Sequence, residues 1–312
     1  MFNSLASPAF WFQVLASTTP VLFATLGANI VHQAGIFNLG IEGTMLICAL
    51  VGVLGSAYSG SLLVGMLFGI FAGVAISWLL GFFTLVLNAP MNSCGVAINL
   101  LAGGGTVFIL TVLTGSKVTS SSLLSLNFPA VNIPIIKDIP VVGEILSGHN
   151  LTTYLSWVMV FVTAMLLYRT KLGRNIRAVG KNEDAALSAG ISVNRIKFLS
   201  LALCGIFCSF GGMYLSMGSL HSFTAGMTAG RGFLSLAMNA MSQGNPIIGF
   251  ASSLLYGFFD SVTIYLQMYS DMDLKLIMAM PYILIIAVLF IVHSGKNMIR
   301  KRTLYYKMCK ED

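Results

Sequence analysis

Long apolar runs separated by short polar interruptions make up most of this chain. A helix needs about 20 apolar residues to cross a bilayer, and shorter apolar helices occur where a span is broken inside protein. On that basis the pattern predicts an all-α, polytopic helical bundle of about nine transmembrane segments (8–10) with broken helices. Two of these segments, 44–58 and 230–243, are too short to cross unaided. The nine segments are 9–31, 44–58, 61–87, 94–114, 151–168, 198–219, 230–243, 247–266 and 274–293.

One hydrophilic interruption, residues 169–197, is long and highly charged. It holds nine of the 27 charged residues; seven are basic, and the two acidic ones are Glu183 and Asp184. Loops rich in Lys and Arg collect on the cytoplasmic side of a membrane, so we expect this loop and the basic tail 296–312 to face the cytoplasm. The four apolar segments between them give the even number of crossings that this requires. Loop 115–150 is then external, and the N-terminus is external if all nine segments cross.

Composition and charge narrow the class of protein. Hydrophobic residues make up 56% and charged residues 9% of the 312 residues, whereas soluble domains carry about 25% charged residues. No Lys or Arg precedes the first apolar run, so we interpret it as a retained span and not as a cleaved signal peptide. We expect one transmembrane domain, 1–295, with the cytoplasmic loop 169–197, followed by a basic cytoplasmic tail, 296–312. The net charge of +7 is concentrated in that loop and tail, where it sets topology and meets anionic membrane lipid; nucleic acid is not an expected partner.

Signatures of an enzyme are missing from the sequence. The Gly295-Lys296 pair lacks the upstream glycine and the following hydroxyl of a P-loop, so we expect no nucleotide site in this chain. Cys204 and Cys208 share a helix face, but a metal site needs more ligands than that helix offers. We therefore predict no catalytic residue, no metal and no cofactor in this chain.

Two apolar segments, 32–43 and 218–233, are interrupted by glycine and polar residues. Glycine-interrupted segments, one in each half of a membrane protein, indicate a transport path. Each carries one charge, Glu42 in the first and Arg231 in the second. The opposite signs predict a buried contact between the two side chains.

Polar residues also recur at helical spacing inside three apolar segments. Such groups are costly in hydrocarbon and usually face the bundle interior or a water-filled path. The alternative is that each group simply bonds a neighbouring helix, but three such faces together favour a polar lumen. The three faces are Asn99/Gly103/Thr106, Ser235/Asn239/Ser242 and Ser253/Gly257/Asp260. The candidate residues of the path are Asn38, Glu42, Asn99, Arg231, Asn239 and Asp260.

The charged loop contains a short D-A-A-x-x-x-G string at 184–190. It resembles the E-A-A-x-x-x-G loop by which permease subunits of ABC importers dock on their ATPases. Residues 182–191 are predicted to form a short helix, with Asn182 as N-cap, acidic residues in its first turn and Gly190 at its end. The alternative is a solvated helix with no docking role. The candidate docking residues are Asn182, Glu183, Asp184, Ala185, Ala186 and Gly190.

Five motifs occur in order along the chain: GIFNLGIEG at 35–43, AINLLA at 97–102, KLGRNIRAVGKNEDAALSAGISVNRIK at 171–197, FTAGMTAGRGF at 223–233 and Asn-Pro at 245–246. Together they resemble those of one family, the permease subunits of nucleoside and simple-sugar ABC importers, close to the branched-chain amino acid and ribose permeases. The chain departs from that family at His32-Gln33, where members often carry Glu-Arg, and at Gln243-Gly244, where they often carry a basic residue and Trp.

The resemblance implies a permease of the bacterial cytoplasmic (inner) membrane that works in a larger complex. Its implied partners are an ABC ATPase subunit, which carries ATP-Mg, a second homologous permease and an external substrate-binding lipoprotein. Nucleosides are the first choice of substrate, and a simple sugar of the ribose or galactose type is the alternative. A less favoured hypothesis is a stand-alone, ion-coupled secondary transporter with Glu42 and Asp260 as coupling carboxylates.

Overall fold

The computed structural model describes residues 7–132, 142–269, 276–277 and 279–290. Regular structure in these ranges is helical, which confirms the all-α prediction. Within the described residues, seven helices are long and apolar enough to cross a membrane. They are α2 (Pro8–Gln33), α3 (Ile41–Ser59), α4 (Leu62–Gly81) continued by the π-helix η1 (Phe82–Val86), α5 (Met91–Thr114), α8 (Leu151–Arg169), α11 (Val193–Met213) continued by the π-helix η2 (Tyr214–Leu220), and α13 (Pro246–Tyr269).

The expected count of nine spans is not confirmed. Segment 44–58 was expected to be too short, but α3 begins at Ile41 and reaches the length of a span. Segment 230–243 does form a short helix, α12 (Arg231–Ser242), of 12 residues. At about 1.5 Å per residue, α12 covers only about half of a hydrocarbon core. The last apolar segment contributes the helix Ala279–Phe290, and the predicted tail 296–312 lies outside the described residues.

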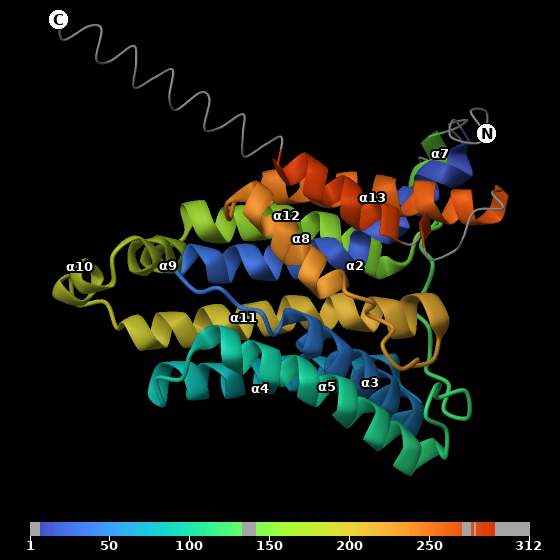
Figure 1. Ribbon diagram of the computed structural model, residues 1–312, viewed down its shortest axis with the longest axis horizontal. Coiled ribbons are helices and arrows are strands. Elements are labelled where there is room, and N and C mark those ends of the chain that lie inside the picture. Colours follow the sequence, from blue (N-terminus) through green and yellow to red (C-terminus); the bar gives the residue numbers. More distant parts are fainter. Residues whose placement is uncertain (1–6, 133–141, 270–275, 278, 291–312) are drawn as a thin grey trace, which may run out of the picture.

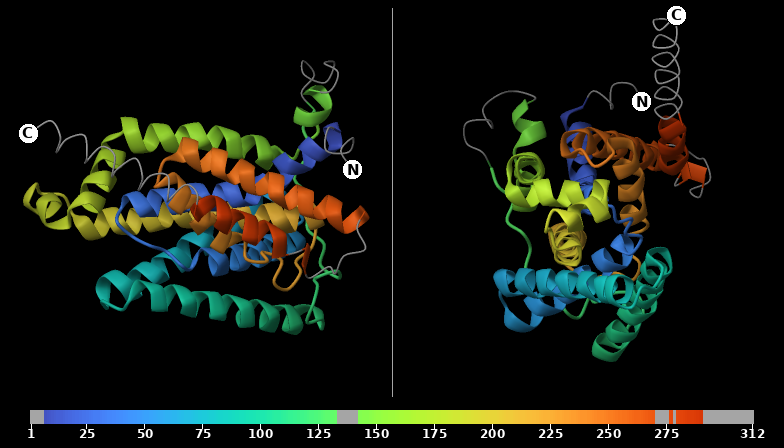
Figure 2. Two further views of the ribbon diagram at one scale, coloured as in Figure 1. Left: turned by 45° about the horizontal axis from the view of Figure 1, so that its top comes forward. Right: turned by 90° about the vertical axis from the view of Figure 1, so that its left-hand side faces the viewer.

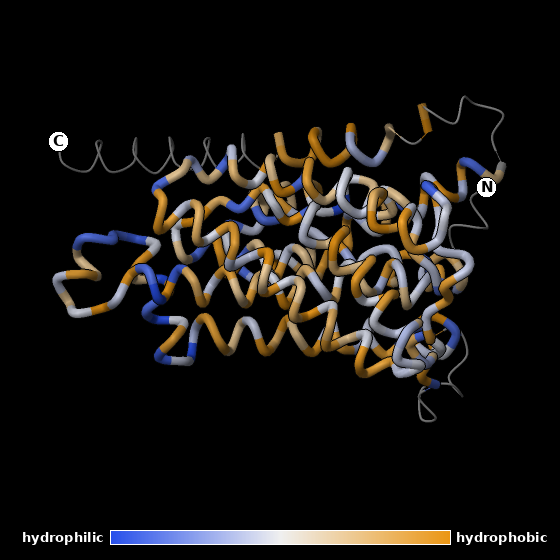
Figure 3. Tube along the Cα trace, turned by 90° about the horizontal axis from the view of Figure 1, so that it is seen from below, coloured by the Kyte–Doolittle hydropathy of each residue, from blue (hydrophilic) through white to orange (hydrophobic). Residues whose placement is uncertain are grey.

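The helices run along one long axis, with different structures at the two ends of the bundle (Figure 1). The helices α9 (Lys171–Lys181) and α10 (Glu183–Ser188) project at one end, while α7 (Val142–Leu146) and the start of α2 lie at the other. Hydrophilic residues gather at the end that holds α9 and α10 (Figure 3). Residues 115–132 and loop 169–197 therefore lie at opposite ends of the bundle, as the charge pattern predicts.

Two helices, α2 and α11, form the centre of the bundle. In their most apolar windows, 89% of α2 and 78% of the α11–η2 helix is buried, compared with 22% for α4 and for α5. Viewed along the bundle, α11 lies between α2 and the layer made by α3, α4 and α5 (Figure 2). A helix that is apolar all round belongs in such an interior, whereas the outward apolar faces of α4 and α5 remain available to lipid or to another protein.

Glycine permits a close backbone contact at the crossing of α4 and α11. A Cβ at Gly73 would overlap the carbonyl oxygen of Gly205, and a Cβ at Gly205 would overlap the carbonyl oxygen of Gly73. Two backbones can approach this closely in a membrane only where both helices carry small residues. The pair thus fixes how α11 sits against α4.

We predict that Gly205→Val destabilises the isolated chain, because the added methyl groups meet the backbone of α4 and Ser77 Oγ, 2.6 Å from the position of a Cβ. Overpacking of this kind costs about 1–3 kcal/mol. The measurement is thermal unfolding in detergent. Gly104→Val is the matched control, since nothing lies within 4 Å of a Cβ at Gly104. Equal stability of the two variants would show that the crossing does not depend on the glycine pair.

Candidate functional site

The first interrupted segment forms a loop, residues 34–40, that leads from α2 into α3. Asn38 is only 3% exposed, and its Oδ1 accepts a hydrogen bond of 2.8 Å from the backbone N–H of Gly40. Its Nδ2 lies 3.8 Å from Cys204 Sγ on α11. A side-chain amide that bonds its own backbone two residues later is a turn-forming contact, so Asn38 shapes the entry into α3.

Asn99 on α5 holds the same entry from the other side. Its Oδ1 accepts from the N–H of Gly43 at 2.8 Å, and its Nδ2 donates to the carbonyl of Leu39 at 2.9 Å. Both hydrogen-bonding groups of the amide are therefore used across α3 and the preceding loop. The side chain of Asn99 therefore bonds a neighbouring helix, which was the alternative to a group that faces an open lumen.

The second interrupted segment leads from η2 into α12. It begins beside residues 115–132, where the N–H of Ser120 donates to the carbonyl of Phe223 at 2.9 Å and the N–H of Phe223 donates to Ser120 Oγ at 2.8 Å. It then turns into the bundle through Gly226 and Gly230, which have φ of 69° and 79°. The other end of α12 lies beside α2, because Gln33 Nε2 donates to the carbonyl of Gly244 at 3.2 Å.

The two interrupted segments meet where Glu42 contacts the start of α12. Oε1 of Glu42 accepts from the N–H of Gly230 at 2.9 Å, and Oε2 accepts from the N–H of Gly232 at 2.6 Å. The first N–H groups of a helix have no partner within the helix and carry its positive end, so a carboxylate there is favourable. A Cβ at Gly232 would meet Glu42 Cα at 2.5 Å, which shows how closely the segments approach.

The predicted buried contact between Glu42 and Arg231 is therefore not an ion pair. The structure brings the two residues together, but both oxygens of Glu42 bind backbone N–H groups. Among the described residues the one salt bridge joins Lys197 and Glu183. Arg231 Nη1 instead donates to the carbonyl of Met227 at 3.4 Å, and the N–H groups at the start of α12 supply the positive end that the carboxylate of Glu42 requires.

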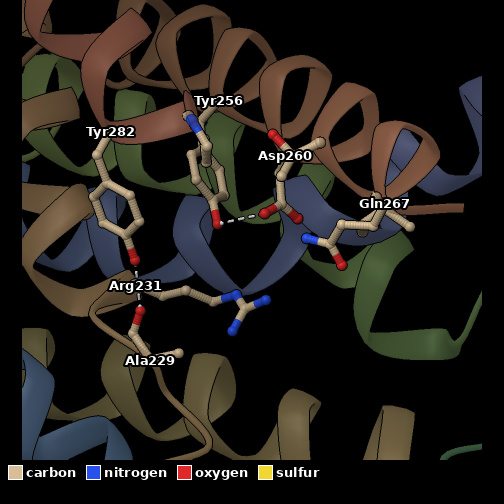
Figure 4. A pocket seen from close by; sticks show the side chains of 9 residues that line it. Ala229, Arg231, Tyr256, Asp260, Gln267 and Tyr282 are labelled. Carbon is tan, nitrogen blue, oxygen red and sulfur yellow. Dashed lines mark hydrogen bonds between the residues drawn. The ribbon is translucent and has the colours of Figure 1, made fainter. Parts of the chain in front are cut away.

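Arg231 lines a cavity of about 270 Å³ with Asp260 on α13 (Figure 4). The hydroxyl of Tyr256 donates to Asp260 Oδ1 at 3.3 Å, and the hydroxyl of Tyr282 donates to the carbonyl of Ala229 at 2.8 Å. Within the described part of the chain, Arg231 Nε and Asp260 Oδ2 are buried without a hydrogen-bond partner. Two residues that line the cavity thus each hold one buried polar atom without a partner in the described residues, while Nη1 of Arg231 donates to the carbonyl of Met227 at 3.4 Å. Its lining residues are Ala229, Arg231, Tyr256, Asp260, Thr263, Ile264, Gln267, Pro281 and Tyr282.

Sequence reasoning identified Arg231 and Asp260 in this cavity but missed Tyr256, Gln267 and Tyr282. The spacing signal for two of these was present, since Tyr256 and Gln267 lie four residues before and seven residues after Asp260, on the same helix face. Tyr282 comes from a separate helix, and its position depends on tertiary packing that no local spacing encodes.

The polar faces of α12 and α13 mostly bond α2. Ser242 Oγ donates to Asn29 Oδ1 at 2.9 Å, and Ser253 Oγ donates to Thr25 Oγ1 at 3.3 Å. Asn239 is 3% exposed, and its Oδ1 is buried without a hydrogen-bond partner in the described residues. These contacts form a polar seam between helices, and they do not line the Arg231–Asp260 cavity.

The predicted short helix is present as α10. Asn182 Oδ1 accepts from the N–H of Ala185 at 3.0 Å, which is the expected N-cap. Gly190 follows the helix with φ of 77°, and the N–H groups of Gly190 and Ile191 bond the carbonyls of Leu187 and Ala186, which closes the C-terminus. In α10 and its two caps, Ala186 alone is buried, and Asn182, Glu183, Asp184, Ala185 and Gly190 are exposed.

One contact joins α10 to the bundle, and a second joins the preceding helix α9 to it. Lys197 Nζ on α11 lies 2.6 Å from Glu183 Oε1 on α10. At the end of α9, a Cβ on Gly180 would overlap the carbonyl oxygen of Gln33, and its Cα lies 3.1 Å from where a Cβ of Gly35 would be. The charged end of the protein is thereby packed on the loop that leads to Asn38 and Glu42.

Comparison with known proteins shows the family to which this chain belongs. Residues 10–292 match the family described as branched-chain amino acid transport system, permease component. The chain belongs to this family. It is therefore a multi-pass membrane permease of an ABC transporter, a transport component and not an enzyme, and such a permease works with ATPase and substrate-binding components.

Individual relatives and one solved structure agree with this assignment. The permease is 31% identical to the guanosine ABC transporter permease NupQ of Bacillus subtilis, over 88% of this chain and 89% of NupQ. It is 30% identical to the nucleoside ABC transporter permease NupC of Lactococcus lactis, over 80% of each chain. A structure described as an inward-facing metal-chelate type ABC transporter superposes with a TM-score of 0.51 at 17% identity, covering 91% of the permease and 84% of that chain; it shows the fold alone.

We predict that Glu42→Ala destabilises the permease by about 2–3 kcal/mol, because it leaves the N–H groups of Gly230 and Gly232 without their charged acceptor. Glu42→Gln, which keeps one acceptor oxygen, has a smaller effect. Both are measured by thermal unfolding in detergent. Adding Arg231→Ala does not restore stability, since the unpaired groups belong to the backbone. Rescue by that second substitution would restore the ion-pair hypothesis.

Proposed function

We propose that this permease takes up nucleosides across the bacterial cytoplasmic membrane. The observation that carries the choice of substrate is the similarity to the guanosine permease, which extends over 88% of this chain. The cavity beside Arg231 supports it, because its two opposite charges sum to zero and suit an uncharged polar solute.

In this proposal α10 is the contact for the ATPase. It projects from one end of the bundle (Figure 1), and exposed side chains surround its single buried residue, Ala186. Leu187, which the motif did not single out, is 56% exposed at this tip and adds an apolar contact. The Glu183–Lys197 ion pair would pass a movement of α10 directly to the central helix α11.

The proposed path for the solute passes the broken helices. Arg231 and Asp260 line it, and Glu42 holds the start of α12 in place beside it. We assign Asn38, Asn99 and Asn239 a bracing role, since Asn38 and Asn99 bond the start of α3 and Asn239 lies in the polar seam.

Further partners complete the transporter in this proposal. They are a second homologous permease, an external substrate-binding lipoprotein and the ATPase that carries ATP-Mg. The outward face of α5 suits a helix of the second permease, because Gly103, Gly104 and Gly105 have open space beside them and small residues let membrane helices approach closely. Membrane lipid covers the remaining apolar surface.

The deciding experiment is reconstitution of the permease in liposomes, alone and with its three kinds of partner. Labelled guanosine, uridine and ribose are offered with ATP or with a proton or sodium gradient. We expect guanosine or uridine to accumulate only with ATP and all partners. Accumulation of ribose alone would indicate a sugar importer, and gradient-driven uptake by the isolated chain would establish a stand-alone carrier.

A second prediction concerns the coupling of ATP hydrolysis to transport. Gly190→Val forces a β-branched residue into a left-handed conformation at a cost of about 1–2 kcal/mol, which distorts the end of α10; we expect ATP-driven uptake to be lost while membrane insertion is kept. Gly115→Val is the matched control, because Gly115 has φ of 70° and no atom within 4 Å of a Cβ, at the opposite end of the bundle. Similar loss of uptake in both variants would argue against a docking role for α10.

A further inference from the structure

The cavity between α12, α13 and the helix Ala279–Phe290 contains two buried polar atoms that the protein leaves unsatisfied. Arg231 Nε can only donate a hydrogen bond, and Asp260 Oδ2, as part of a carboxylate, can only accept one. Neither has a partner in the described residues, and the two side chains form no salt bridge with each other. A buried polar atom without a partner costs free energy, so the pair is poised for a ligand that supplies an acceptor and a donor.

The rest of the lining restricts the shape of that ligand. Tyr256 and Tyr282 present their rings at the cavity, and both hydroxyls are already engaged, with Asp260 and with the carbonyl of Ala229 (Figure 4). Ile264 and Pro281 add apolar surface. Aromatic and apolar walls favour a planar ring that hydrogen-bonds at its edge.

The cavity also suits an uncharged ligand of moderate size. Its volume of about 270 Å³ is slightly below the range of roughly 300–1,000 Å³ that is usual for drug-sized ligands, so the cavity suits a smaller group. One Arg and one Asp sum to zero charge, so a neutral solute leaves no net buried charge. A heterocyclic base meets each requirement: it is planar and neutral, and its edge carries an acceptor beside a donor.

We infer that this cavity binds the heterocyclic base of a nucleoside by its polar edge, with a ring carbonyl or ring nitrogen accepting from Arg231 and an N–H donating to Asp260. This inference rests on the proposed uptake of nucleosides and adds the site at which the permease itself reads the base. Gln267, whose amide points toward Asp260 (Figure 4), supplies a further hydrogen bond to the same edge.

The test compares two nucleosides with the same sugar, inosine and purine riboside, in the complete transporter. Inosine carries a carbonyl beside an N–H at its base edge, and purine riboside has neither. The readout is the ratio of their kcat/KM values for uptake, measured for the wild type and for variants with the same binding lipoprotein, so that selectivity set by the lipoprotein cancels.

We expect Asp260→Asn to lower the inosine to purine riboside ratio by about tenfold, because one charged hydrogen bond to the base is lost. Tyr256→Phe, which removes only the hydroxyl that orients Asp260, shifts the ratio in the same direction by a smaller factor and serves as the test if the first variant fails to assemble. Glu144→Gln removes a carboxylate on α7, outside the cavity, and leaves the ratio unchanged.

Three results would overturn the inference. The first is an equal loss of both nucleosides in Asp260→Asn and Tyr256→Phe, which means that the cavity does not read the base while nucleoside uptake still stands. The second is uptake of both nucleosides at the wild-type kcat/KM in both variants, which means that neither side chain contacts the solute. The third is wild-type uptake of ribose or leucine with no uptake of either nucleoside, which removes the proposed function itself.

Discussion

The carboxylate of Glu42 at the N-terminus of α12 is the interaction on which the rest of this architecture depends. A helix that begins inside a membrane exposes N–H groups where no water satisfies them. Here one side chain binds two of them, at Gly230 and Gly232, and so lets α12 start within the bundle. The start of α3, from which Glu42 projects, is itself held by Asn38 and Asn99. The broken helices therefore stabilise each other, and the cavity beside Arg231 exists because α12 begins where it does.

Local sequence patterns predicted much of this structure, and the reasons are physical. Apolar runs of span length can only be satisfied as helices in a membrane, so the all-α bundle followed from the sequence. Helix α10 followed as well, because the N-cap Asn182 and the left-handed Gly190 are encoded within a few residues. The number of spans did not, because segment 230–243 forms only the 12-residue helix α12 and the last apolar segment contributes only the short helix Ala279–Phe290 to the described residues.

For the same reason, the sequence identified some candidate functional residues but not the groups that they contact. Charged groups in apolar segments are so costly that Glu42, Arg231 and Asp260 could be identified individually. Their partners could not, because a backbone N–H carries no sequence signal, and the partner of Glu42 is the positive end of a helix. Several members of the predicted polar faces bond a neighbouring helix, as Ser242 bonds Asn29 and Ser253 bonds Thr25, whereas Asp260 lines the cavity. Helical spacing shows that polar groups share a face but not what that face meets.

The contact of Gly180 with Gln33 and Gly35 has a mechanical consequence. It joins α9 to the loop before α3 through backbone atoms, with no side chain between them. Side chains can change rotamer when a neighbouring segment moves, whereas two backbones in direct contact must move together. A displacement of that loop also moves Glu42 and, through its hydrogen bonds, the first turn of α12. A displacement of α9 would thus move the first turn of α12. The transmission of this movement would depend on close backbone contacts at three positions that lack a side chain: Gly35, Gly180 and Gly232.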